Sequence, residues 1–421
     1  MVTATITRPS PRAWVTIAFA MFAVGWGANQ FSPMLIVYRH ELRLTAGAVA
    51  GLFLVYALTL IPGLLVGGPA SDRFGRRPVV WPFVALSPLA TLLLVLGPRS
   101  LAMIAAGRAL AGLCSGVVFG AATAWVQEVS PGEGTSARRA ALALTAGFGL
   151  GPVAAALLAQ WAPGPLLTPY LPHLVIGVAA AAALGRTPEG APRPAGVRET
   201  RNARRRWPPG AVRSARFWLA VAPASPLVFG SVALAIVVLP EDVTSAGSLS
   251  AGFAGLMTAL SFAAGVAVQP FARRLRDALT GSVAGLACAA AGTAVGIGAV
   301  AGPDRVLAGA AAVLLGLAYG LCLVSGLRQA EQMAAPDERG AVVACYYALA
   351  YLGFAVPYLA AGLGAAAGKA GAFTALTAII AGLALWTAGY AARLRRPARQ
   401  AEADRSVSRL ARDCNSVSGI G

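Results

Sequence analysis

The sequence predicts an all-α polytopic membrane protein with twelve transmembrane helices in two pseudo-symmetric six-helix bundles. Its composition is the first reason: 57% of the 421 residues are hydrophobic and 12% are charged, whereas about a quarter of a soluble domain is charged. The second is a series of apolar runs near the length of about 20 residues that a membrane-crossing helix needs. The third is an Arg-rich segment at 68–78 that recurs in degraded form at 265–274.

Each apolar run is predicted to be one helical span, because backbone polar groups in lipid must be paired within the segment. The runs are 13–38, 47–67, 78–97, 101–126, 139–161, 167–185, 217–240, 249–270, 278–300, 304–327, 340–363 and 371–393. The first run is too long for the apolar core of a signal peptide, so we expect it to remain as the first span.

The runs divide the chain into five regions. We predict a cytoplasmic N-terminal segment 1–12, a bundle 13–185, a cytoplasmic Arg/Pro-rich linker 186–216, a bundle 217–393 and a disordered cytoplasmic tail 394–421. With the N-terminus inside, 28 arginines lie on the cytoplasmic side and five basic residues on the other. This satisfies the positive-inside rule. We therefore expect a plasma-membrane monomer with both termini in the cytoplasm.

The positive charge lies in the loops rather than on a nucleic-acid-binding surface. The net charge of +18 comes from arginines that cluster between spans, so we expect contact with anionic lipids at the cytoplasmic face and no nucleic acid. The five cysteines lack metal-site spacing, and no nucleotide-binding loop is present. We expect no metal, no cofactor and no enzyme activity.

The segment 68–78 is a charged hinge between two spans. Asp72 can pair with an arginine or cap the next helix, whose dipole favours a negative charge at its N-terminus. Gly75 permits a tight turn, and Pro78 suits the first turn of a helix. Such a hinge either gates a conformational change or only fixes topology through local ion pairs.

Arg108 is the one charged residue placed clearly within a span. A buried cation in a bilayer is costly unless it faces protein or water, so we assign it to proton coupling or to a polar or anionic substrate group. The alternative is snorkelling toward the outer surface. Gly112, Gly116 and Gly120 follow at four-residue spacing, which favours close helix packing.

Span 1 carries the polar pair Asn29 and Gln30 close to Pro33. Span 7, its symmetry partner, is interrupted near Pro226, and interrupted spans often line the central site of a transporter. We assign Asn29 and Gln30 to substrate contact, with interhelical hydrogen bonding as the alternative. His173 is either a coupling residue or a hydrogen-bonded core residue.

Three motifs together resemble those of the major facilitator superfamily, over essentially the whole membrane region. The hinge matches at Gly68, Asp72, Arg73, Gly75, Arg76 and Arg77. The Arg108 segment resembles a second motif. Gly147, Gly151 and Pro152 resemble the antiporter motif, although Ala155 and Ala156 stand where that motif has two glycines. In the family, the hinge aspartate belongs to a cytoplasmic charge network that stabilises one access state.

The resemblance implies a secondary transporter that moves a small molecule by alternating access. We favour proton-coupled efflux because of the antiporter-like motif. We expect a mostly apolar or polar-neutral substrate, because no acidic residue lies clearly at mid-membrane to pair with a polycation. An uptake symporter or facilitator for a metabolite is one alternative, and a non-transporting membrane receptor or scaffold is another.

Overall fold

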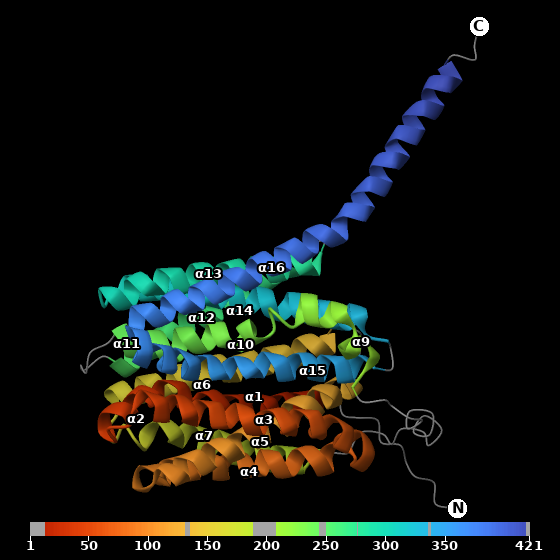
Figure 1. The fold of residues 1–421 in the computed structure, drawn as a ribbon. Helices are drawn as coiled ribbons and strands as arrows, with labels where there is room; N and C mark the ends of the chain where they lie inside the picture. The colour runs from red at the N-terminus through yellow and green to blue at the C-terminus, as the bar shows by residue number, and fades with distance from the viewer. Residues whose placement is uncertain are drawn as a thin grey trace, which may run out of the picture.

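The computed structural model describes residues 13–130, 135–187, 208–243, 250–275, 277–335 and 338–417. Every regular element within these ranges is a helix, and the long helices run side by side (Figure 1). A helix pairs the backbone groups of an apolar segment within that segment, which is what lipid demands. The predicted all-α polytopic fold is confirmed.

In the first half of the chain, the described residues form spans 1 to 6. The elements are α1 (Ala13–Asn29), α2 (Phe31–Glu41), α3 (Ala46–Phe74), α4 (Arg76–Leu96), η1 (Gly97–Arg99), α5 (Leu101–Val129), α6 (Thr135–Trp161), η2 (Thr168–Tyr170) and α7 (Leu171–Gly185). Span 1 consists of α1 and α2 and breaks at Gln30. The break has a local cause, because Pro33 cannot donate to the carbonyl four residues before it and its ring crowds that turn.

In the second half, the described residues form spans 7 to 12. The elements are α9 (Gly210–Arg213), η3 (Phe217–Val221), α10 (Pro226–Ala233), η4 (Leu234–Val238), α11 (Leu239–Val243), α12 (Ser250–Arg274), α13 (Ala278–Ala301), α14 (Arg305–Met333), α15 (Arg339–Tyr351), η5 (Leu352–Ala355) and α16 (Val356–Val417). Span 7 runs from η3 to α11 and is interrupted by a turn at 222–225, just before Pro226.

Ten stretches of the described residues are long and apolar enough to cross a membrane. Span 1 is not among them because Gln30 divides it into two shorter helices. Spans 11 and 12 form one stretch, Gly340–Leu394. They separate at Gly368, whose φ of 75° interrupts α16 in a conformation that glycine tolerates. With these two adjustments the structure agrees with the twelve predicted spans.

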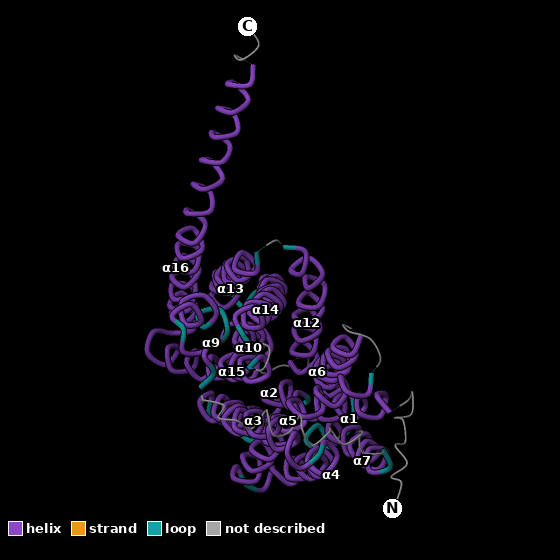
Figure 2. Tube along the Cα trace, turned by 90° about the vertical axis from the view of Figure 1, so that its right-hand side faces the viewer, coloured by secondary structure: helices purple, strands orange, loops and turns teal. Residues whose placement is uncertain are grey.

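The helices form two bundles that lie against each other (Figure 2). We call α1 to α7 the N-bundle, and η3 to residue 394 of α16 the C-bundle. The hinge end is the end where α3 meets α4 at Gly75, and the opposite end is where α2 meets α3 at Thr45. The N-terminal segment 1–12 and most of the linker, 188–207, lie outside the described residues.

Both bundles contain the same close helix crossing. In the N-bundle, a Cβ at Gly147 of α6 would collide with the backbone of α1 near Trp26. In the C-bundle, a Cβ at Gly353 of η5 would collide with the backbone of α10 at Gly230. Span 5 therefore packs on span 1 as span 11 packs on span 7. The internal symmetry predicted from the sequence is present in the packing.

The C-terminal tail differs from the prediction. We expected disorder over 394–421, whereas α16 continues as a helix to Val417 and projects away from the bundles (Figure 1). Two physical reasons explain this. The tail is rich in Arg and Ala, which have high helix propensity. Span 12 also supplies an existing helix end, so the costly nucleation step is avoided.

The seam between α3 and α5 yields a test of the packing. A Cβ at Gly116 would collide with the α3 backbone at Leu60, whereas a Cβ at Gly149 would meet nothing within 4 Å. We expect Gly116→Val to destabilise the protein by about 1–3 kcal/mol, the usual cost of overpacking, and Gly149→Val to change little. Thermal unfolding of the purified variants in detergent measures both. Equal unfolding midpoints would show that this seam tolerates a side chain.

Candidate functional site

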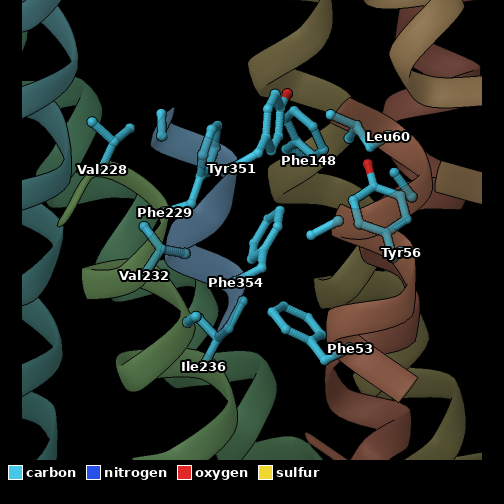
Figure 3. Close-up of a cluster of buried hydrophobic side chains, with 14 of the residues drawn as sticks. Phe53, Tyr56, Leu60, Phe148, Val228, Phe229, Val232, Ile236, Tyr351 and Phe354 are labelled. Atoms are coloured by element: carbon cyan, nitrogen blue, oxygen red, sulfur yellow. The ribbon is translucent and has the colours of Figure 1, made fainter. Parts of the chain in front are cut away.

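The centre of the interface between the bundles is a layer of aromatic side chains (Figure 3). Phe53 and Tyr56 come from α3 of the N-bundle. Phe354 of η5 meets them edge to face, at ring-centroid distances of 4.9 and 5.8 Å. This geometry is favourable because the positive edge of one ring faces the negative face of another. We call these three residues, with Phe229 and Tyr351, the central layer.

The C-bundle side of the central layer is a stack of rings. Phe229 of α10 stacks on Tyr351 with centroids 4.4 Å apart and planes at 11°, and it lies 5.2 Å from Phe354. The interruption of span 7 positions Phe229, because α10 begins afresh at Pro226, where the fixed φ of proline suits a first helical turn. All these rings are buried.

Arg108 of α5 lies behind the N-bundle side of the central layer and is 1% exposed. Its guanidinium lies 4.3 Å from the ring centroid of Phe31 and 4.4 Å from that of Tyr56. Nη1 donates to the carbonyl oxygen of Ala28 at 3.1 Å, and Nε donates to that of Leu52 at 3.4 Å. The side chain therefore faces protein and does not reach the outer surface.

The charge of Arg108 is stabilised without being neutralised. Among the described residues, no carboxylate forms an ion pair with it. Carbonyl oxygens and ring faces carry only partial negative charge, although a desolvated cation–π contact can contribute about 2 kcal/mol. A net positive charge consequently lies close to the bundle interface, separated from Phe354 of the C-bundle by the ring of Tyr56.

Asn29 and Pro152 were predicted in separate motifs, but Asn29 donates a hydrogen bond to the carbonyl that Pro152 leaves without a helical partner. Pro152 has no N–H, so the carbonyl of Phe148, four residues earlier, loses its helical partner. Asn29 Nδ2 donates to that carbonyl oxygen at 2.8 Å, and Asn29 Oδ1 accepts from Ser32 Oγ at 2.9 Å. Both ends of the amide are used within the N-bundle. This is the interhelical bond that we kept as the alternative to substrate contact.

Gln30 begins a chain of buried polar side chains within the N-bundle. Its Nε2 donates to Thr91 Oγ1 at 3.1 Å, and Thr91 Oγ1 lies 2.7 Å from His173 Nδ1. His173 Nε2 lies 3.4 Å from Ser87 Oγ. Gln30 is therefore engaged with α4, and His173 is hydrogen-bonded on both sides. A coupling role for His173 stays a prediction.

Arg76 is the centre of the hinge network. It is buried, and its Nη2 lies 2.7 Å from both Asp72 Oδ1 and Glu128 Oε1. It also donates to the hydroxyl of Ser71. Glu128 belongs to the last turn of α5, so the network ties the hinge to span 4. A largely buried guanidinium needs such partners, because an unpaired one would cost several kcal/mol.

The other hinge residues have smaller roles in the packing. Gly75 ends α3 with a φ of 103°, a value that favours glycine. Arg77 donates to the carbonyl oxygen of Gly185 at the end of α7. Arg73 is exposed. A Cβ at Gly68 would meet nothing within 4 Å, so helix packing does not explain that glycine.

The second copy of the hinge uses a different charge arrangement. Nη1 of Arg328, from α14, donates to the carbonyl oxygens of Ala272, Arg273 and Leu275 at 3.2, 3.3 and 3.2 Å. A cation at a helix C-terminus complements the helix dipole. The first hinge uses carboxylates around an arginine, whereas the second uses the end of α12 itself.

Ion pairs lie at the opposite end of the interface. Arg39 of α2 pairs with Glu241 of α11, which joins the two bundles. Lys369 Nζ lies 3.2 Å from both Asp242 Oδ1 and the Asp242 backbone oxygen. Nearby, the Gly252 N–H of α12 donates to the Gln160 side chain of α6 at 3.0 Å. The described contacts thus hold the bundles together at the centre and the opposite end.

The predicted residues fall in three places rather than in one site. Asn29, Arg108 and the span 5 motif support the N-bundle beside the central layer, Gln30 turns to α4, and the hinge forms its own network. Sequence reasoning missed the partner Glu128, the opposite-end ion pairs and most of the central layer. An acidic residue near the end of a span, on the same side as the hinge arginines, is a signal that could have found Glu128.

Comparison with known proteins agrees with the fold. Residues 17–235 match the family model described as Major Facilitator Superfamily. Multidrug resistance protein D of Escherichia coli (strain K12) is 36% identical over 98 residues, 23% of this chain and 25% of that protein. The chain thus spans about a quarter of the length of this curated relative.

Two solved structures are similar in fold over nearly the whole chain. A mutant of the nucleoside transporter NupG gives a TM-score of 0.71 at 9% identity, covering 90% of this chain and 99% of that one. A POT family transporter in complex with 5-aminolevulinic acid gives 0.70 at 12% identity, covering 89% and 95%. Identities this low establish the shared fold alone.

The bond between Asn29 and the Phe148 carbonyl can be tested by a double-mutant cycle. Asn29→Ala should cost about 1 kcal/mol, because it leaves that carbonyl unpaired in the membrane. In a Pro152→Ala background the cost should fall, since the new N–H can pair with the carbonyl. Unfolding in detergent measures all four proteins. Thr59→Ala in α3 is the control, because the Thr59 hydroxyl donates to carbonyl oxygens of its own helix, and equal coupling of Thr59 to Pro152 would contradict the assignment.

Proposed function

The chain belongs to the Major Facilitator Superfamily, and on this premise we propose that it is a secondary transporter that moves a small molecule across the plasma membrane. The two bundles alternate access to a site between them, and the leading mode is export in exchange for protons. The termini lie in the cytoplasm in this proposal, which makes the hinge end cytoplasmic and the opposite end external.

One observation carries the proposal: aromatic rings from both bundles meet at the middle of their interface. Phe53 and Tyr56 touch Phe354 through ring contacts alone. Dispersion contacts are individually weak, so the rings can part and re-form as the bundles rock. The same rings offer faces to an apolar or aromatic substrate. Each ring pair contributes about 0.5–1.5 kcal/mol beyond the buried area.

Arg108 supports a substrate that is neutral or anionic. It lies against Tyr56 of the central layer without a carboxylate partner among the described residues. A cationic substrate would meet an unneutralised positive charge in a region of low dielectric, where repulsion between charges is strong. An anionic substrate group would gain from the same field. This adds anionic compounds to the mostly apolar or polar-neutral class that we expected from the lack of mid-membrane acidic residues.

The ion pair of Arg39 and Glu241 supports a role as a latch at the opposite end. It connects α2 of the N-bundle to α11 of the C-bundle, so the pair must separate when the opposite end opens. The hinge network of Asp72, Arg76 and Glu128 lies at the other end. We assign it the complementary task of stabilising one access state from the cytoplasmic side.

The direction of transport rests on two resemblances. Gly147, Gly151 and Pro152 resemble the antiporter motif, and 98 residues resemble Multidrug resistance protein D. Both favour export. Uptake or facilitated diffusion of a metabolite is the second candidate. The two modes separate in proteoliposomes: an exporter that exchanges protons shows substrate-induced proton movement, and the absence of such movement with retained substrate flux would favour the facilitator.

The charge preference can be tested at Arg108. We expect Arg108→Gln to slow transport of an anionic aromatic compound about tenfold or more, the loss of one charge-assisted interaction, and to affect a neutral analogue much less. Initial rates in proteoliposomes measure both. Arg139→Gln is the matched control, because Arg139 also lies over an aromatic ring, 4.0 Å from that of Trp14. Equal losses for both analogues would contradict the proposed role.

The latch can be tested by exchanging its charges. Glu241→Arg places two arginines together, so we expect it to disfavour the state that is closed at the opposite end and to slow transport several-fold. Adding Arg39→Glu restores the pair in reverse and should recover most of the rate. Labelling of a cysteine placed at Val49, beside the pair, reports the opening directly. If the double variant recovers neither the transport rate nor the labelling pattern, the ion pair of Arg39 and Glu241 does not act as a latch.

A further inference from the structure

A cavity of about 310 Å³ lies between the bundles at the opposite end, away from the central layer. Its walls come from α2 and α3 on one side and from η4, α11 and α16 on the other. Arg39, Glu241, Asp242 and Lys369 all line it. The volume lies at the lower end of the range for ligand pockets, about 300–1,000 Å³.

The cations of this cavity are more accessible than the carboxylates. The side chains of Arg39 and Lys369 are 33% and 55% exposed, whereas those of Glu241 and Asp242 are 20% and 14% exposed. Lys369 directs its ammonium to two oxygens of Asp242, and an ammonium has three donors. Arg39 uses one of its nitrogens on Glu241. Both cations therefore retain N–H groups for an additional acceptor.

The remaining wall of the cavity is apolar and built from small side chains. On α16 it includes Ala361, Gly364 and Ala365, and on α3 it includes Val49 and Ala50. These residues lie within stretches that are long and apolar enough to cross a membrane. The wall extends from the charged helix ends toward the membrane interior. A ligand with an anionic group at one end and an apolar chain at the other would match the two exposed cations and this wall.

We propose that this cavity binds one membrane phospholipid, with its phosphate at Lys369 and Arg39 and one acyl chain along the small-residue wall. Each cation is already paired with a carboxylate, so the lining has no net charge. Phosphate is the anionic group found at this depth of a bilayer, and it would be a further acceptor for the exposed N–H groups of the two cations, whose carboxylate partners are less exposed. The two cations come from different bundles, so the lipid bridges them and favours the state in which the opposite end is closed. This site is separate from the proposed substrate site and from the expected lipid contacts at the cytoplasmic face.

Two variants with matched controls test the site. Lys369→Gln removes a cation of the cavity, and Arg99→Gln removes an exposed cation at the same end that does not line it. Gly364→Leu fills the apolar wall. Gly362→Leu adds the same bulk two residues away, outside the lining. A Cβ at either glycine would meet nothing within 4 Å, so both variants are expected to fold, with unchanged thermal unfolding as the check.

Native mass spectrometry of the purified full chain, titrated with dioleoyl-phosphatidylglycerol, measures binding. We expect Lys369→Gln and Gly364→Leu each to weaken one bound lipid about tenfold, and the two controls to match the unchanged protein. Dioleoylglycerol, which has no phosphate, and glycerol 3-phosphate, which has no chains, should both bind far more weakly.

Three results would overturn the proposal. Equal binding to Lys369→Gln and Arg99→Gln would show that the charge of the cavity is irrelevant. Equal binding to Gly364→Leu and Gly362→Leu would show that the wall is not occupied. Competition by glycerol 3-phosphate as strong as that by the lipid would make the cavity a site for a free anion. None of these readouts depends on transport, so they stand apart from the test of the proposed function.

Discussion

A bilayer supplies no water to pair a broken helix, and the polar architecture of this protein follows from that constraint. Spans 1 and 5 each contain a proline, and each proline leaves a carbonyl without its helical N–H. The side chain of Asn29 reaches the carbonyl that Pro152 frees. Arg108 donates to Ala28, beside the break in span 1. Asn29 and Arg108, which the sequence assigned to substrate contact or coupling, thus supply hydrogen bonds to backbone carbonyls at irregular points of the helices.

Helix α3 connects the parts of the molecule that must change together. Its 29 residues, with Pro62 and Pro69 inside the helix, span roughly 44 Å at about 1.5 Å per residue. It carries Phe53 and Tyr56 at the centre and Asp72 at the hinge end, and it packs against α5, which carries Arg108 and Glu128. In the proposed transport cycle, this shared helix is the physical connection between the bundle interface and the hinge network.

The sequence predicted the helical class, the spans and the symmetry well, because hydropathy and proline positions determine them directly. It could not identify the central layer, since Phe53 and Phe354 lie in runs where nearly every neighbour is also apolar. The sequence drew attention to Asp72 in the hinge but not to Arg76 as its centre. Arg76 is the buried member of the network, and the sequence does not show which hinge residue is buried. The pairing of Arg39 with Glu241 joins residues 202 positions apart, and only tertiary structure brings them together. The helical tail was missed because it is polar and has no apolar run to mark it as a helix.

The partial exposure of the opposite-end ion pairs makes them sensitive to the salt content of the surrounding solution. Arg39 and Lys369 are reached by solvent, and the Debye length falls from about 10 Å at 0.1 M salt to about 3 Å at 1 M. Concentrated electrolyte weakens these attractions, while Arg76, the most buried cation of the three sets of ion pairs, is less accessible to salt. Under the proposed alternating access, with the opposite end outside the cell, the balance between the two access states would depend on external ionic strength. Transport rates measured in buffers of different salt content would then start from different populations of the same protein.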